Sequence, residues 1–182
     1  MTQSQPNSRH CFVCGLESPV GLKLRFYDNG VDEVRCTYLV AESYNGYPGM
    51  VHGGILAAML DEAGGRALMI HDHNRFMMTA RLELRYRQPT PVQTELTLIG
   101  HIIKDKGRVA EAASEIRLPD GTVSAEATMT LVAFPVEGDL DALGWRVYPD
   151  DGLSSAKGRH RGIGTQACLK RGSAYKPGHG RI

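Results

Sequence analysis

One carboxylate lies two helical turns after a pair of glycines in a strongly apolar stretch of this sequence. Residues 52–68 read HGGILAAMLDEAGGRAL, with Asp61 eight positions after Gly53. A partly desolvated carboxylate can act as a general base or as a nucleophile. Glycines at a helix N-terminus leave backbone N–H groups open to an anion, because no Cβ obstructs the approach. The stretch therefore offers an acid–base group and an oxyanion site.

The side of this predicted helix that carries Asp61 holds mostly small residues. Those within about 60° of it on a helical wheel are Gly54, Ala57, Ala58, Gly64 and Gly65, and the bulky residues opposite are Ile55, Leu56, Met59, Leu60 and Ile70. We expect a trough that a ligand or a neighbouring subunit fills; a carboxylate satisfied at a subunit interface is the alternative. Gly53 and Asp61 are about 12 Å apart along the axis, so they would serve one atom only across a dimer interface.

Two other residues of this stretch, Glu62 and His52, are weaker candidates. Glu62 lies four positions before Arg66, which predicts a solvated surface ion pair worth about 0.2–0.5 kcal/mol. A histidine beside a glycine turn more often hydrogen-bonds that turn than acts as a base. For His52 we expect a structural role or a role in orienting substrate.

Cys11 and Cys14 form one CxxC motif next to His10. Such a pair suggests a zinc site or a redox site. A structural zinc site takes four ligands, typically from two such pairs, so Cys36 would have to join from a strand. We therefore predict no metal and no cofactor, and expect the pair to pack a terminal arm.

Alternating polarity predicts six strands around one long helix. The helix is expected over residues 53–71, and the strands over residues 21–28, 33–40, 76–88, 94–105, 107–119 and 121–134. Asn29-Gly30 predicts a hairpin between the first two strands, and Pro or Gly breaks separate the last four. This order predicts an α+β fold in which an antiparallel sheet wraps the helix.

The strand over residues 76–88 has two distinct faces. Strict alternation places Met78, Ala80, Leu82, Leu84 and Tyr86 on the face that packs on the helix, and Thr79, Arg81, Glu83, Arg85 and Arg87 on the other. Thr79 is the uncharged polar member of the second face. That face is expected to meet solvent or a partner subunit.

Three regions follow from composition. Residues 1–20 read as an irregular arm, residues 21–135 as the folded domain, and residues 136–182 as a basic, Gly-rich tail that is partly disordered. Trp145, Val147 and Tyr148 are expected to pin the start of that tail to the domain.

From Lys157 onward the chain has seven Lys and Arg and no Asp or Glu, so its net charge of +1 leaves −6 on residues 1–156. An acidic body argues against nucleic-acid binding.

The sequence carries no sign of a membrane or secretory segment. It contains no apolar run of about 18 residues, and its start lacks the basic and apolar regions of a signal peptide. Four cysteines in 182 residues do not form a dense disulfide framework. We expect a cytoplasmic protein.

These motifs resemble the acyl-CoA thioesterases of the hotdog fold. The helix segment NGYPGMVHGGILAAMLDEAGG, followed by MMTARLELRYRQPTPV, is similar to the phenylacetate-pathway type and the THEM type, which carry an HGG-x6-D helix. The later KGRVAEAASEIRLPDGTVSAEATMTLV resembles that family's last two strands, and HCFVCGLESPVGLKLRF its leading segment in bacterial members. The resemblance covers residues 11–134.

The resemblance implies an acyl-CoA thioester hydrolase that needs no metal and works as a homodimer or a dimer of dimers (homotetramer). Asp61 matches the acid that attacks the thioester or activates water. Gly53 matches the glycine whose N–H polarises the carbonyl, with the N–H of Gly54 beside it as part of the same oxyanion site. His52 and Gly54 complete the motif as substrate-binding residues. Thr79 matches the Ser/Thr that positions the acid or the water, delivered from the other subunit.

Four further binding residues follow from the resemblance less directly. Lys106, Gly107 and Arg108 match the positions at which some relatives contact the phosphates of coenzyme A, although basic residues at a hairpin tip are usually only solvated. Several relatives place Asn or Gln six residues before the histidine to orient water. Here that position is Gly46, and Asn45 is one residue early.

Two other classes of hotdog protein compete with the hydrolase. A non-catalytic acyl-CoA-binding or regulatory module would have no use for a desolvated acid such as Asp61. A dehydratase of 3-hydroxyacyl thioesters would need a catalytic histidine in a helix context that His52-Gly53-Gly54 does not match. Hydrolysis is therefore favoured over both.

Overall fold

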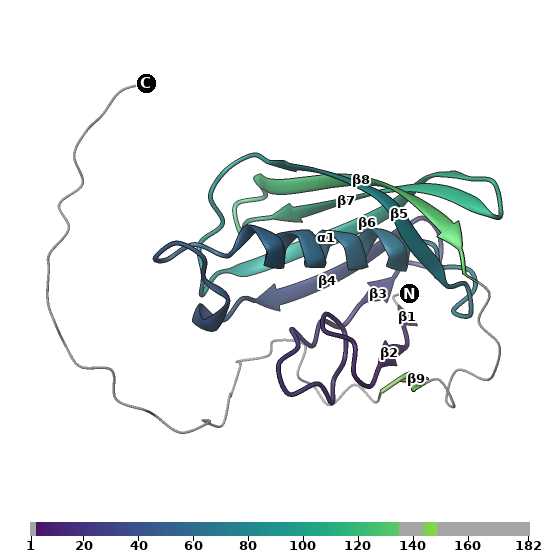
Figure 1. Cartoon of the computed structure of the whole chain (residues 1–182), viewed down its shortest axis with the longest axis horizontal. Coiled ribbons are helices and arrows are strands. Elements are labelled where there is room, and N and C mark those ends of the chain that lie inside the picture. Colours follow the sequence, from purple (N-terminus) through teal and green to yellow (C-terminus); the bar gives the residue numbers. More distant parts are fainter. Residues whose placement is uncertain (1–2, 135–143, 149–182) are drawn as a thin grey trace, which may run out of the picture.

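The computed structural model describes residues 3–134 and 144–148 and shows one helix packed on one large sheet (Figure 1). The helix α1 spans Gly53–Ala67, and a short 3-10 helix η1 spans Glu42–Tyr44. The strands of the large sheet are β1 (Gln3–Ser4), β3 (Tyr27–Asp28), β4 (Glu33–Leu39), β5 (Met77–Tyr86), β6 (Glu95–Asp105), β7 (Val109–Arg117) and β8 (Val123–Ala133). A separate pair joins β2 (Asn7–Ser8) to β9 (Trp145–Arg146).

The large sheet is antiparallel throughout, with the order β1-β3-β4-β6-β7-β8-β5. This confirms the predicted α+β hotdog architecture, in which the helix lies along one face of the sheet. The sheet has seven strands rather than the six predicted, because Gln3–Ser4 of the N-terminal arm pairs with β3. No helix in the described ranges is both long and apolar enough to cross a bilayer.

The first predicted strand is shorter than its alternating pattern suggests. Only Tyr27–Asp28 pairs with β4, in the hairpin that Asn29-Gly30 predicts. Leu22, Leu24 and Phe26 are buried as the alternation requires. The backbones of the two leucines bond to the loop of the arm, since Leu22 N–H donates to the Phe12 carbonyl and Leu24 N–H to the Val13 carbonyl. The arm therefore supplies part of the lining of the core.

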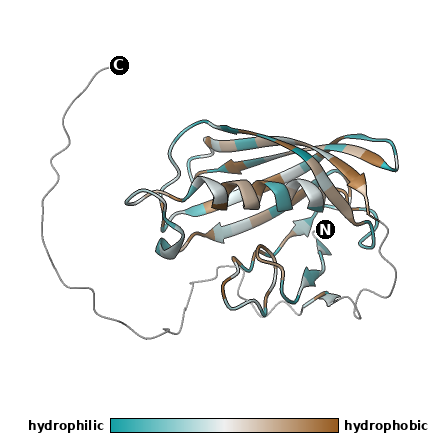
Figure 2. Cartoon of the chain, viewed as in Figure 1, coloured by the Kyte–Doolittle hydropathy of each residue, from teal (hydrophilic) through white to brown (hydrophobic). Residues whose placement is uncertain are grey.

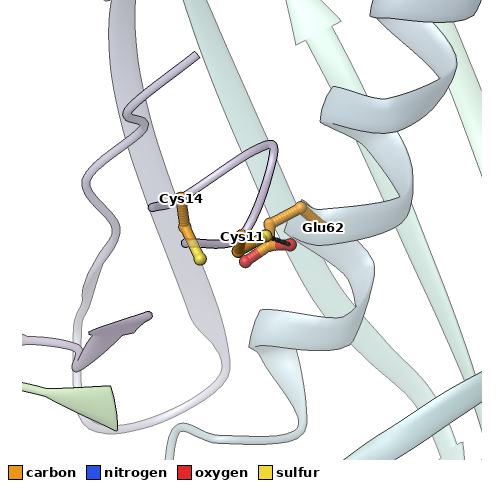
Figure 3. A group of neighbouring side chains, drawn as sticks. All are labelled: Cys11, Cys14 and Glu62. Atoms are coloured by element: carbon orange, nitrogen blue, oxygen red, sulfur yellow. Dashed lines mark hydrogen bonds between the residues drawn. The ribbon is translucent and has the colours of Figure 1, made fainter. Parts of the chain in front are cut away.

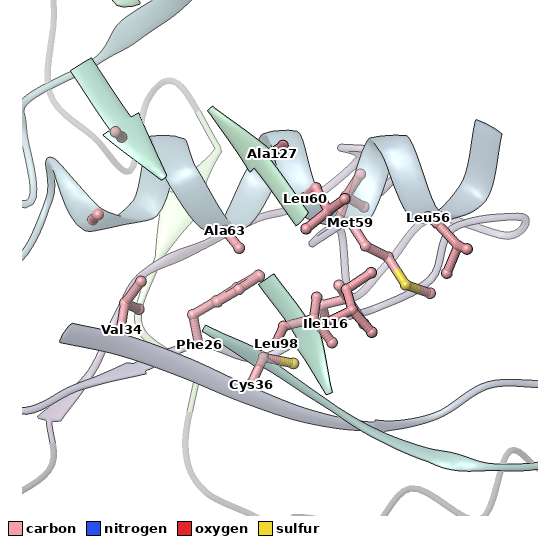
Figure 4. Packing of buried hydrophobic residues seen from close by; sticks show 14 of the residues in the cluster. Phe26, Val34, Cys36, Leu56, Met59, Leu60, Ala63, Leu98, Ile116 and Ala127 are labelled. Atoms are coloured by element: carbon pink, nitrogen blue, oxygen red, sulfur yellow. The ribbon is translucent and has the colours of Figure 1, made fainter. Parts of the chain in front are cut away.

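The core lies between α1 and the sheet (Figure 4). Leu56, Met59 and Leu60 of the helix are buried against strand residues such as Leu98 and Ile116. In Figure 2 the hydrophobic colour falls on parts of the strands and on the loops of the N-terminal arm, and the helix alternates between paler and hydrophilic segments. Burial of this helix face, which the 3.6-residue periodicity predicts, holds α1 in place and so determines where Asp61 lies.

Two glycines permit the close approach of helix and sheet. A Cβ on Gly100 of β6 would lie 2.1 Å from the Ala63 carbonyl oxygen, so this position has no room for a side chain. A Cβ on Gly64 would lie 2.2 Å from the sulfur of Met129 on β8. Gly64 therefore packs on the sheet, and its predicted place in the trough beside Asp61 is wrong.

A β-bulge in β5 reverses the predicted faces at the start of that strand. Thr79 pairs with Leu131 and Arg81 with Thr130, so Ala80 is the extra residue. Because Leu131 is buried against the helix, Thr79 lies on the helix side, and Met78 lies outside with 53% of its surface exposed. Beyond the bulge the prediction holds, since Leu82 and Leu84 pack against the core.

The start of the tail is attached to the body as predicted, through Trp145 and Tyr148. The Trp145 ring makes an edge contact with Phe76, at 5.2 Å between centroids, and the Tyr148 hydroxyl lies 3.3 Å from a Glu17 carboxylate oxygen. Val147 is exposed and pins nothing. The rest of the tail predicted over residues 136–182 lies outside the described residues, and the division of the chain at residue 20 stays a prediction.

Candidate active site

The candidate acid is held by a threonine from the neighbouring strand. Thr79 Oγ1 donates a hydrogen bond of 2.7 Å to Asp61 Oδ1. The bulge in β5 makes this contact possible, because it turns Thr79 toward α1. The bond forms within one chain, which corrects the expectation that Thr79 reaches the acid from another subunit. It occupies one carboxylate oxygen and leaves Oδ2 available to a water or a substrate.

An open pocket of about 170 Å³ adjoins this pair. Its lining combines the acid and its threonine with the C-terminal half of α1 and with the tail segment: Asp61, Glu62, Gly65, Arg66, Met69, Arg75, Phe76, Met77, Thr79, Leu131 and Trp145. Ligand sites for molecules of drug size usually have about 300–1,000 Å³. The pocket beside Asp61, as a single chain forms it, is therefore too small to enclose an acyl group together with its carrier.

The N-terminus of α1 is capped by its own histidine. His52 is the N-cap, and its Nδ1 accepts the Gly54 N–H at 2.9 Å. This confirms the structural role expected for His52. It also corrects the expectation that the Gly54 N–H serves as an oxyanion donor, because that group is already bonded. The Gly53 N–H has no acceptor among the described residues, whereas the Gly53 carbonyl accepts the Tyr86 hydroxyl at 2.9 Å.

One chain does not bring the two predicted halves of the site together. Gly53 is the first residue of α1 and Asp61 lies two turns later. A regular helix separates these residues by about 12 Å along its axis. The pocket beside Asp61 has no lining residue from the N-terminus of the helix. A carbonyl in contact with Asp61 is therefore out of reach of the Gly53 N–H of the same chain.

The remaining predicted binding residues lie away from the acid. Asn45 is exposed and follows η1, where it forms a bridge with Val51. Lys106, Gly107 and Arg108 form the exposed turn between β6 and β7, and Gly107 has a φ of 78°. Neither group contacts the pocket beside Asp61 directly.

Arg75 connects that turn to the pocket, a link that the sequence did not reveal. Its guanidinium pairs with both carboxylate oxygens of Asp105 and donates to the Gly107 carbonyl at 3.2 Å. The hydrogen bond from Arg75 is the main reason why the pKa of Asp105 falls to about 2. Arg75 also lines the pocket. It lies between α1 and β5, where no periodic pattern marks it as functional.

The Glu62–Arg66 pair forms as predicted but is not solvated. Arg66 is 2% exposed, and its Nε donates to Glu62 Oε1 at 2.9 Å. Its guanidinium also donates to the Pro6 carbonyl and lies 5.2 Å from the ring centroid of Phe26 and 5.0 Å from that of Trp145. The arm and the tail segment cover this face of α1, and that coverage is what the helical wheel could not show.

A second group of polar atoms lies where the arm crosses α1 (Figure 3). Sulfur atoms of Cys11 and Cys14 and a carboxylate oxygen of Glu62 all lie within 4.8 Å of one another, which is close enough to hold a metal ion. Cys36, which the sequence left open as a fourth ligand, is buried in the core and is not in this group. The arm packs on the helix through this group, as expected for the CxxC.

Loss of the N-cap is expected to destabilise the helix that carries the acid. Replacing His52 with alanine removes the acceptor of the Gly54 N–H, so we expect the free energy of unfolding to fall by about 0.5–2 kcal/mol. Urea denaturation followed by circular dichroism measures this change. His101→Ala serves as a matched control, because His101 is an exposed strand residue. Equal stability of the His52 variant and the wild type would show that the cap contributes nothing.

The comparisons with known proteins point to one family. A family model described as "Thioesterase superfamily" matches residues 48–125. The chain is 26% identical over 132 residues to a rat (Rattus norvegicus) protein named acyl-coenzyme A thioesterase THEM4, an alignment that covers 71% of this chain and 56% of the rat protein. The chain thus spans about half the length of the curated relatives it matches.

Solved structures show the same fold. One is described as a thioesterase superfamily protein; it has 35% sequence identity and a TM-score of 0.62, and the match covers 68% of this chain and 63% of that one. Another is a Streptococcus mutans protein bound to acetyl CoA, with 18% identity and a TM-score of 0.53, covering 58% and 84%. At 18% identity, the similarity to the Streptococcus mutans structure shows only that the two proteins share a fold.

Proposed function

We propose that this protein hydrolyses acyl-CoA thioesters to a free acid and coenzyme A, because residues 48–125 match the model of the thioesterase superfamily. The observation that carries the proposal is the Asp61–Thr79 hydrogen bond beside an open pocket. A protein that only binds acyl-CoA has no need of a carboxylate oriented in this way. The names of the curated relatives support the same activity.

The hydrolysis needs one group to deliver water and another to stabilise the oxyanion. Thr79 fixes Asp61 Oδ1, so Oδ2 can take a proton from water or attack the carbonyl carbon itself. The oxyanion that forms would be stabilised by the Gly53 N–H at the N-terminus of α1, where the helix dipole adds partial positive charge. One such donor typically contributes about 2.7–4 kcal/mol to transition-state stabilisation.

A homodimer would place these groups around one thioester. In one chain Asp61 and Gly53 are two turns apart, so the donor facing each acid would come from a second copy. The sheet offers a surface for this assembly, because β5 is an edge strand of ten residues with no strand partner on its outer side among the described residues. Unpaired edge strands readily pair with another chain. Pairing of dimers into tetramers remains a prediction of the resemblance.

The turn between β6 and β7 is the proposed contact for the phosphates of coenzyme A. Lys106 and Arg108 are exposed there, and the Arg75–Asp105 pair holds the turn near the pocket. Neither basic residue has an ion pair within the described ranges, so both charges are available to phosphate oxygens. Asn45, next to the N-terminus of α1, is proposed to contact substrate from the loop side.

Release of free thiol tests the proposed activity. The full-length protein is incubated with acyl-CoAs of increasing chain length, and coenzyme A is followed with a thiol-reactive dye. We expect turnover of at least one acyl-CoA, and a gel-filtration mass of a dimer or a tetramer at micromolar concentration. Acyl-CoA binding by calorimetry without turnover of any substrate would support the binding module instead. A monomeric mass of an active protein would contradict the two-copy site.

Removing the hydroxyl of Thr79 is expected to lower turnover. Thr79→Val keeps the shape of the side chain but leaves Asp61 without its donor, and hydrogen bonds to charged groups contribute about 1.5–3 kcal/mol. We expect kcat to fall by about 10- to 150-fold with little change in KM. Thr79→Ser keeps the hydroxyl and should retain most of the activity. Full activity of Thr79→Val would show that the hydrogen bond to Asp61 does not contribute to catalysis.

A further inference from the structure

The cysteines of the N-terminal arm form a pair that the proposed hydrolysis does not use. Cys11 is half-buried and Cys14 is fully buried, and both are free thiols (Figure 3). The loop that holds them is tight, because the Gly15 N–H donates to the Cys11 carbonyl at 2.9 Å. A Cβ on Gly15 would lie 2.3 Å from that carbonyl oxygen. The backbone therefore keeps the two sulfur atoms near each other.

The surroundings of Cys11 stabilise a thiolate. A hydrogen bond from the Cys14 thiol is the main cause that lowers the pKa of Cys11 to about 7, and burial and the charge of Glu62 oppose it. The Val13 N–H also donates to Cys11 Sγ, at 3.3 Å. The Cys11 S–H donates to Glu62 Oε2 at 3.8 Å, a contact that favours the neutral thiol and that the hydrogen bond from Cys14 outweighs. Low pKa and partial exposure are the properties of a reactive cysteine.

Cys14 has the opposite properties. Its hydrogen bond to Cys11 and its burial raise the pKa of its thiol. Solvent does not reach this sulfur, so an external reagent meets Cys11 first. The pair therefore combines an accessible nucleophile with a shielded second thiol, which is the arrangement of a nucleophilic and a resolving cysteine.

We propose that Cys11 and Cys14 are a redox-active pair that a small disulfide of the glutathione type oxidises to an intramolecular disulfide. The Cys11 thiolate attacks one sulfur of the reagent, forms a mixed disulfide and releases one thiolate, which takes up a proton. Cys14 then attacks Cys11 Sγ and gives up its proton, and the second thiolate leaves and takes up that proton. In sum, two protein thiols are oxidised by two electrons and one reagent disulfide is reduced to two thiols.

A metal ion fits the same group less well. Within the described ranges the group supplies three donor atoms, one short of a closed structural zinc site. Arg66 is a buried cation bonded to Glu62, and its charge opposes a second cation. Disulfide formation needs only the two sulfur atoms and leaves the Glu62–Arg66 pair intact. The proposal does not depend on the thioesterase activity.

Redox titration of the full-length chain tests the pair. A Cys168→Ser background removes the fourth cysteine of the sequence as a competing thiol. The reduced protein is equilibrated with mixtures of reduced and oxidised glutathione, alkylated and analysed by mass spectrometry. We expect a loss of two hydrogen masses, a Cys11–Cys14 bond in the peptide map, and full reversal by dithiothreitol.

Two variants separate the roles of the cysteines. Cys14→Ala should stop at a glutathione adduct on Cys11 and should raise the pH midpoint of Cys11 alkylation, because the donor that lowers its pKa is lost. Cys11→Ala should form neither the adduct nor the disulfide. Cys36→Ala is the matched control: its thiol is buried away from the pair, so oxidation should proceed as in the background protein.

Two results would overturn the proposal. One is a wild-type pair that accumulates the glutathione adduct, or stays reduced, at glutathione ratios that oxidise other dithiol motifs. The other is a purified protein that holds about one equivalent of zinc, with thiols that react only after a chelator removes it. The second result would identify the group as a metal site. Circular dichroism of each variant shows that the fold is retained.

Discussion

Asp61→Asn is expected to lower kcat for acyl-CoA hydrolysis by about 10²–10⁴-fold, the usual contribution of a general acid–base group. Asparagine has the size of aspartate but can neither accept a proton from water nor attack a carbonyl. Thr79 can still donate to the amide oxygen, so the local structure should persist. Steady-state kinetics with the best acyl-CoA measures the loss, and KM should change little because the interaction acts in the transition state.

A matched control removes a carboxylate that the site does not use. Glu95→Gln changes an exposed residue at the start of β6 and should leave kcat and KM unchanged. Thermal unfolding of both variants separates catalytic loss from loss of fold. Full activity of Asp61→Asn would show that the proposed mechanism is wrong even if the protein is a thioesterase.

The second large effect concerns the stability of the helix–arm contact. Arg66→Met is expected to lower the free energy of unfolding by about 3–5 kcal/mol, because Glu62 is left without its partner in a mostly buried position. The substitution also removes the guanidinium from between Phe26 and Trp145 and frees the Pro6 carbonyl. Urea denaturation measures the change, which is a large part of the stability of an ordinary domain.

Two further variants identify the cause of that loss. Arg81→Met removes an arginine whose pair with Glu83 is exposed, and should cost at most about 1 kcal/mol. The double variant Glu62→Gln/Arg66→Met should be more stable than Arg66→Met alone, since no unpaired charge remains buried. If Arg66→Met is within 1 kcal/mol of the wild type, burial of the pair does not contribute to stability.

The strand β5 shows why local pattern fails at a functional position. Alternation predicted Thr79 on the face away from the helix, and it is correct for Leu82 and Leu84. A single extra residue, Ala80, reverses the faces before it and places Thr79 against Asp61. The bulge depends on the register with β8, a strand more than forty residues later, so no window of the sequence around Thr79 contains that information.

Arg66 shows that local sequence pattern also fails to predict which residues are buried. The i,i+4 spacing predicted its pair with Glu62, because helix geometry alone sets that contact. Its burial comes from Pro6 in the arm and Trp145 in the tail segment, which lie far from it in the sequence. A helical wheel places residues relative to one another but contains no information on which distant segment covers each face.

By itself, the sequence determined the helix, its N-terminal glycines, the position of the acid and the α+β architecture, because helix and strand periodicity are local consequences of side-chain geometry. Only the tertiary structure decided that Thr79 holds Asp61, that His52 occupies the Gly54 N–H, and that Cys11, Cys14 and Glu62 meet. The contact between Thr79 and Asp61 depends on strand register, and the meeting of Cys11, Cys14 and Glu62 depends on the path of the arm. Those are set by packing over the whole chain and not by neighbouring residues.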